Sequence, residues 1–203
     1  FELVAKQATP APVTAAPQSA PQSSGSTSDT VRLSLESVEA AQASARALAS
    51  AATNLDELRA AMAEFDGCAL KHTASNLVFS DGNPEADIMF VGEAPGKNED
   101  LQGEPFIGAA GKLLDRLLGE IGIERDDVYI ANVLKCRPPG NRDPRPDEID
   151  SCKGFLKSQL ELVDPRVVIT LGNFATKLLL KRNVGITRLR GQIYPWWHRQ
   201  LVP

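Results

Sequence analysis

The sequence predicts an α/β fold, a three-layer α/β/α sandwich around a central, mainly parallel four-stranded sheet. Two observations carry this prediction. Short apolar runs alternate with segments whose apolar residues recur at helical spacing, and glycine, proline or polar residues flank each run. Short strands joined by helices form a parallel sheet that is covered on both faces.

The chain divides near residue 52. Residues 1–52 are a low-complexity tail rich in Ala, Pro and Ser, which we expect to be disordered or partly helical. Residues 53–203 are expected to form one domain. It opens with a helix, because Thr53 and Asn54 have the residue types of a cap and acids follow in the first turn.

The remaining elements follow from apolar spacing. The expected strands are 88–91, 128–133, 167–171 and a fourth that starts near residue 200. The expected helices are 109–121, 146–162 and 173–182. In the first of these, leucines at 113, 114, 117 and 118 have the spacing of a core-facing stripe. We expect the chain to continue beyond Pro203, because a short, half-covered parallel strand is a poor end for a fold.

Charge is unevenly distributed. The net charge is −4, yet residues 135–199 hold thirteen basic and six acidic residues. A concentrated basic face favours phosphate binding, although a solvated surface is the alternative. The sequence contains no apolar run of the roughly 18–20 residues that cross a bilayer, and its start lacks a secretion pattern. We therefore expect a cytoplasmic protein without a membrane partner.

The most informative stretch follows strand 88–91. There the sequence reads Gly92-Glu93-Ala94-Pro95-Gly96, then Glu99-Asp100, then Gly103-Glu-Pro-Phe-Ile-Gly108. It matches neither the G-x-G-x-x-G pattern nor a P-loop, so we expect no nucleotide cofactor. Its acids can orient a water or act as a general base. A tight turn with solvated acids is the alternative.

Two further residues indicate which class of ligand the loop binds. Phe106 lies in a loop bounded by glycine and proline, so its face is available for stacking on a flat ligand, unless it plugs the core. Asn132 ends a strand at the edge where ligands bind in parallel sheets. Its amide matches a ring that presents a carbonyl beside an N–H, as uracil does, unless it caps a turn.

Together these segments, with the block Lys135-Cys-Arg-Pro-Pro-Gly-Asn-Arg142 and the run 189–191, resemble the family 4 uracil-DNA glycosylases, the iron–sulfur type. The resemblance runs from about Leu55 to the end of the chain. It implies a DNA repair enzyme that flips deoxyuridine out of single- or double-stranded DNA and hydrolyses its N-glycosidic bond. Uracil leaves and an abasic site remains. The alternative is a uracil-DNA binding protein of the same fold with little turnover.

The resemblance also implies roles for individual residues. Glu93 and Glu99 are the expected catalytic residues. The residues expected to bind the base are Gly92, Ala94, Pro95, Phe106 and Asn132. The residues expected to contact DNA are Lys135, Arg137, Arg142 and Arg190. We expect the enzyme to act as a monomer.

The sequence departs from the family pattern in two places. Family members hold a 4Fe–4S cluster with four cysteines, and here Cys68, Cys136 and Cys152 match three of them while Phe65 occupies the first position. We expect no cluster, because three thiolates make a poor cluster site, and we expect Phe65 to fill the vacated volume. The family's His-Pro-Ser-like motif is not reached by residue 203, and His198 is read as a surface residue.

Overall fold

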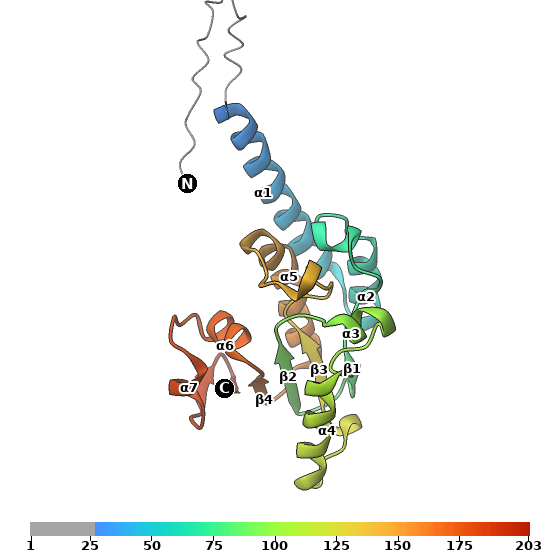
Figure 1. Ribbon diagram of the computed structural model, residues 1–203, viewed down its shortest axis with the longest axis vertical. Coiled ribbons are helices and arrows are strands. Elements are labelled where there is room, and N and C mark those ends of the chain that lie inside the picture. The colour runs from blue at the N-terminus through green and yellow to red at the C-terminus, as the bar shows by residue number, and fades with distance from the viewer. Residues whose placement is uncertain (1–26) are drawn as a thin grey trace, which may run out of the picture.

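The computed structural model describes residues 27–203, with side chains from residue 38 onward. At its centre is a six-stranded sheet in the order β1-β3-β2-β4-β6-β5 (Figure 1). The four inner strands are parallel, as predicted, and both edge strands are antiparallel to their neighbours. The strands are β1 Asp81–Gly82, β2 Ile88–Gly92, β3 Tyr129–Asn132, β4 Val167–Thr170, β5 Tyr194–Trp196 and β6 Arg199–Val202.

The helices agree closely with the predicted ranges, and α3 and α7 are additions. They are α1 Thr27–Ala51, α2 Leu55–Glu64, α3 Lys97–Gln102, α4 Ala109–Glu120, α5 Pro146–Val163, α6 Asn173–Leu180 and α7 Ile186–Leu189. Short 3-10 helices are η1 Ala69–His72, η2 Arg125–Asp127 and η3 Pro139–Asn141. No helix in the described part of the chain is long and apolar enough to cross a membrane.

Different helices cover the two faces of the sheet. The side chains of β2 alternate, so that Met89 and Val91 pack on one face and Phe90 on the other. Leucines of α5 cover the first face, and Leu114 and Leu118 of α4 cover the second. The predicted three-layer sandwich is confirmed.

Half of the leucine stripe predicted on α4 is wrong. Leu114 and Leu118 are buried, whereas Leu113 and Leu117 are 48% and 49% exposed. Only one row of side chains on this helix reaches the sheet, because α4 lies on the outside of the molecule, and the neighbouring row faces solvent.

The body of the protein begins earlier than the predicted boundary. Ala45 and Ala49 of α1 are almost completely buried, in a cluster that includes Leu58 of α2 and Phe155 of α5. The C-terminal half of α1 therefore belongs to the domain, because small side chains let it approach α5 closely. The part of the predicted tail before residue 27 lies outside the described residues.

The sheet brings the loops of the candidate site to one edge. In the register of the strands, Gly92 at the end of β2 lies beside Asn132 at the end of β3, and Val91 lies beside Thr170 of β4. Parallel sheets bind ligands beyond the carboxyl ends of their strands. The predicted binding residues therefore share the expected edge.

Candidate functional site

The loop after β2 meets the end of β3 through a glycine. A Cβ atom at position 92 would lie 2.4 Å from both Asn132 Oδ1 and Phe106 Cζ. Any larger residue would push the amide and the ring away, so close packing at this point depends on Gly92. Gly92, Phe106 and Asn132, which lie far apart in the sequence, therefore meet at one point.

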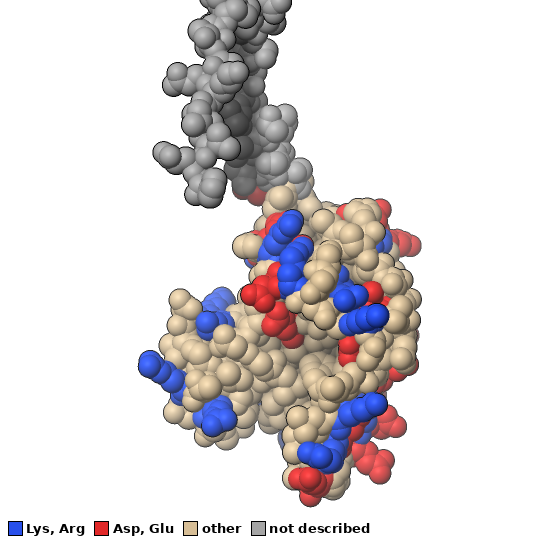
Figure 2. Space-filling model, in the orientation of Figure 1, with Lys and Arg blue, Asp and Glu red and all other residues tan. Residues whose placement is uncertain are grey.

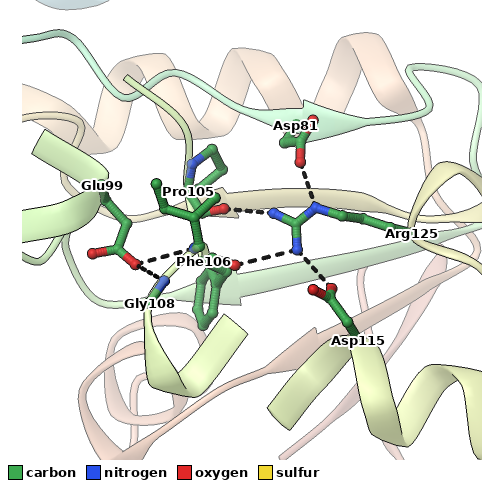
Figure 3. A network of polar contacts seen from close by, with 8 residues as sticks. Asp81, Glu99, Pro105, Phe106, Gly108, Asp115 and Arg125 are labelled. Carbon is green, nitrogen blue, oxygen red and sulfur yellow. Dashed lines mark hydrogen bonds and ion pairs between the residues drawn. The ribbon is translucent and has the colours of Figure 1, made fainter. Parts of the chain in front are cut away.

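Glu99 of α3 holds the far half of this loop. Its Oε1 accepts hydrogen bonds from the backbone N–H groups of Ile107, at 3.1 Å, and Gly108, at 2.7 Å (Figure 3). Gly108 immediately precedes α4, where backbone N–H groups lack partners within the helix. The carboxylate therefore anchors the start of α4, and one of its two oxygens is engaged before any substrate binds.

Arg125, which the sequence analysis did not single out, holds the same loop from the other side. Its Nη2 donates to the carbonyl oxygen of Pro105 at 2.6 Å, and its Nη1 donates to that of Phe106 at 3.3 Å (Figure 3). No local pattern signals this contact, because Arg125 lies in a charged turn after α4.

Asn132 and Phe106 line a cavity of about 320 Å³, together with Ala94, Glu99 and Gly108. Asn132 is 2% exposed, and its Oδ1 has no hydrogen-bond partner among the described residues. An unpaired buried acceptor costs free energy, and a ligand N–H group that reached it would remove that cost. The ring of Phe106 adds an aromatic face, which favours a flat heterocycle.

Glu93 faces a different space. It lines a groove of about 650 Å³ with Asp143, Asn173 and Lys177, among others. Burial, with a smaller contribution from Asp143, raises the pKa of the Glu93 carboxyl. Glu93 and Glu99, which are both expected to be catalytic, therefore line two different hollows. The residues separate because the chain turns sharply after β2, and buried Pro95 lies between them.

The four basic residues predicted to contact DNA have different environments. Lys135 is fully buried, so it cannot reach a phosphate as predicted, and burial lowers the pKa of its ammonium group to about 7. Arg142 forms two hydrogen bonds, at 2.9 and 2.5 Å, with the buried carboxylate of Glu148. Arg137 is half-buried and hydrogen-bonded within its own loop. Arg190 is exposed.

Other basic residues border the groove of Glu93. Lys177, Lys181 and Arg182 of α6 and the turn that follows line it. The visible face of the lobe formed by α6 and α7 carries basic side chains and no acidic ones (Figure 2). In the sequence these residues stand out only as part of an uneven charge distribution. In the folded chain, these basic residues line one side of the groove that Glu93 also lines.

Comparisons with known proteins show the family of this chain. Residues 79–202 match the model of the uracil DNA glycosylase superfamily. A type-4 uracil-DNA glycosylase of Archaeoglobus fulgidus is 48% identical, over 70% of this chain and 73% of the relative. Type-4 enzymes of Sulfurisphaera tokodaii and Saccharolobus solfataricus are 44% and 47% identical, over 72% and 70% of this chain and 69% and 68% of the relatives. The chain belongs to the type-4 uracil-DNA glycosylase family.

The three cysteines of this member of the type-4 uracil-DNA glycosylase family lie close together. Cys68, Cys136 and Cys152 line a single cavity of about 240 Å³, which Phe65 also lines. Phe65 packs its ring against Phe155, with ring centroids 5.5 Å apart. The expectation that Phe65 fills the vacated volume is therefore only partly met, because a cavity lined by its ring and by the three cysteines remains.

The chemistry of this cavity does not fit a cluster held by four thiolates. The lining supplies three thiols, and Phe65, at the sequence position of the first family ligand, contributes a hydrocarbon ring that cannot bind iron. A hydrogen bond from Cys152 lowers the pKa of Cys68 to about 7, whereas burial raises the pKa of Cys136 to about 12. In the described residues, no three Cys, His, Asp or Glu side chains are placed to hold a single metal ion.

His198 lies outside the cavity of this type-4 family member. It is exposed in the turn between β5 and β6, and its Nε2 lies 2.9 Å from Asp164 Oδ1. Asp164 also accepts a hydrogen bond from buried Arg199 at 2.6 Å. His198 thus takes part in a surface ion-pair cluster, which agrees with its interpretation as a surface residue.

Proposed function

We propose that this chain hydrolyses the N-glycosidic bond of deoxyuridine in DNA, so that uracil is released and an abasic site remains. One observation carries the proposal at the level of the site: the unpartnered, buried Oδ1 of Asn132 beside the ring of Phe106 in one cavity. Uracil presents an N–H flanked by carbonyl groups on a flat ring, which complements both side chains. Type-4 uracil-DNA glycosylases are also its relatives.

The base reaches the cavity by leaving the stack, which costs a few kcal/mol. Stacking on Phe106 offsets part of that cost, since stacking is worth about 1–3 kcal/mol per base. Asn132 contributes through its amide, which can accept from the uracil N–H and donate to a neighbouring carbonyl oxygen. Gly92 permits both contacts, because it leaves room for the ring and the amide to lie against each other.

Hydrolysis forms a bond between a water oxygen and the sugar C1′ and breaks the bond from C1′ to uracil. The bonding electron pair leaves with the base, so uracil becomes anionic and the sugar becomes cation-like. An amide donor at the uracil oxygen stabilises the developing anion. We assign this donor role to Asn132, which is preorganised at the end of a strand.

The two acids take different roles in this proposal. Glu99 anchors the loop with Oε1 and keeps Oε2 available at the cavity. Glu93 lies on the side of the basic groove, where the sugar and phosphates of an extruded nucleotide would lie. A carboxylate there can stabilise the sugar cation and orient the attacking water.

The DNA backbone is proposed to follow the groove beside the cavity. Lys177, Lys181 and Arg182 border it, and exposed Arg190 lies on the neighbouring turn. Basic side chains gain affinity by neutralising phosphates, so binding should weaken as salt increases. Lys135 is left out of this contact set because it is buried. The monomeric state and the cytoplasmic location stay predictions from the sequence.

We further propose that the enzyme acts without a four-thiolate cluster, since the donor set of its cysteine cavity lacks a fourth ligand. The three thiols then serve as small buried packing groups. Cavity residues Asn132 and Phe106 supply base recognition, and this part of the mechanism uses no metal.

The test is a release assay with synthetic oligonucleotides that carry one deoxyuridine, in single- and double-stranded form. We expect free uracil and an alkali-labile site from both, and no cleavage when thymidine replaces deoxyuridine. Lys177→Ala with Lys181→Ala should lower affinity for both substrates and reduce its salt dependence. Tight retention of the deoxyuridine strand without uracil release, at enzyme excess, would instead indicate a binding protein with little turnover.

A further inference from the structure

Arg125 occupies an unusual position for a residue of a surface turn. It lies at the start of η2, and its side chain is only 21% exposed. Its guanidinium contacts β1, α4 and the loop before α4 at once (Figure 3). Two carboxylates orient it: Asp81 accepts from Nε at 2.5 Å, and Asp115 accepts from Nη1 at 2.8 Å. Held in this way, the group aims its remaining donors at the loop.

The loop needs such support because Phe106 has a strained backbone. Its φ is 54°, in the left-handed region that residues with a side chain rarely adopt. The carbonyl oxygen of Phe106 also packs tightly on α4, where a Cβ at Gly111 would lie 1.5 Å from it. A relaxed Phe106 would turn this carbonyl and move the ring out of the cavity.

The peptide groups on both sides of Phe106 are held by side chains. Arg125 binds the carbonyl oxygens of Pro105 and Phe106, and Glu99 binds the N–H groups of Ile107 and Gly108 (Figure 3). Arg125 itself is not among the residues that line the cavity. An effect of Arg125 on the reaction therefore passes through the elements that it holds, and both the loop and α4 contribute residues to the cavity lining.

We propose that Arg125 is a positioning residue, which fixes Phe106 in its left-handed conformation so that the ring stands ready to stack on the extruded base. This inference rests on the proposed function for its catalytic consequence. The clamp itself, formed by Asp81, Asp115 and Arg125, is a property of the free protein. Sequence alone does not reveal it, because its parts come from an edge strand, a helix and a turn.

The first test measures amide hydrogen exchange in the free protein. Arg125→Gln should speed exchange at Ile107 and Gly108 by about tenfold, and leave the amides of β2 and β3 unchanged. Arg116→Gln is the matched control, because Arg116 is an exposed arginine on α4. Asp115→Asn is a milder second variant, expected to have a smaller effect of the same kind. Unchanged exchange in both test variants would overturn the clamp.

The second test is a double-mutant cycle read by single-turnover uracil release at enzyme excess. Arg125→Gln should slow release by about tenfold when Phe106 is present, and by less than about twofold in a Phe106→Ala background. An equal loss in both backgrounds would refute action through Phe106. If the wild-type chain released no uracil, the proposed function would fail, while the exchange measurement would still decide whether the clamp exists.

Discussion

Replacing Asn132 with leucine should raise stability and abolish most activity. The side chain is 2% exposed and its Oδ1 has no partner among the described residues, so the free protein carries an unsatisfied acceptor. Such a group costs about 1–3 kcal/mol, and leucine has a similar shape without the polar atoms. We therefore expect Asn132→Leu to increase the free energy of unfolding by about 1 kcal/mol, after allowance for imperfect packing.

The same substitution removes the group that is proposed to read uracil. One preorganised donor to a developing anion is worth about 2.7–4 kcal/mol, so single-turnover release should slow by about 100- to 1,000-fold. Unfolding is followed by urea titration, and release is measured with a deoxyuridine oligonucleotide at enzyme excess.

Asn54→Ala is the control for this experiment, because Asn54 caps α2. Its Oδ1 accepts a hydrogen bond from the backbone N–H of Glu57 at 2.9 Å. It should lower stability by about 1 kcal/mol and leave release unchanged. If Asn132→Leu lowered stability and kept wild-type release, the unpaired amide would have neither the cost nor the role assigned to it.

Three further predictions follow from the same environments. Phe106→Ala should slow uracil release by about tenfold or more, with undamaged DNA bound as before; faster release would contradict the stacking role. Lys135 has a pKa of about 7 in the folded protein and about 10.5 in the unfolded chain. Between these pH values the unfolded chain binds one more proton at this residue, so the free energy of unfolding rises with pH. Lys135→Met should flatten that rise in denaturant titrations across this range, and an unchanged slope would refute it. Finally, protein produced in cells supplied with abundant iron should show no absorption of visible light by an iron–sulfur cluster. Its urea midpoint of unfolding should stay the same after treatment with an iron chelator. A brown, iron-containing product would overturn the cluster-free proposal.

The inner strands β2, β3 and β4 could be predicted because helices cover both faces of the sheet and none of their residues is exposed. Residues 88–91 are a continuous apolar run and residues 167–171 are apolar apart from Thr170, which is what a strand between two helical layers requires. The edge strand β1 has only two residues and β5 contains a proline, so neither forms a recognisable run. Their pairing depends on neighbours that the tertiary fold supplies. Leu113 was misjudged for a related reason, because spacing does not reveal how wide a stripe the sheet covers.

Within the site, the sequence could predict the position of residues that directly follow a strand. Asn132 follows an apolar strand directly, and the order of the chain fixes its edge. The separation of Glu93 from Glu99 depends on how the loop turns, which no periodic pattern encodes. Lys135 belongs to a basic, proline-rich block, and that context favoured a DNA contact, yet its side chain points into the core.

Three unfavourable features lie near one edge of the sheet: the unpaired amide of Asn132, the strained backbone of Phe106 and the buried ammonium group of Lys135. Proteins tolerate such costs where function requires them. The first two face the cavity, where a bound base would relieve the amide and use the ring. Lys135 does not line that cavity, and burial is what lowers the pKa of its ammonium group. Its cost is therefore that of burial and is separate from base recognition, which is why Lys135→Met should change stability more than uracil release.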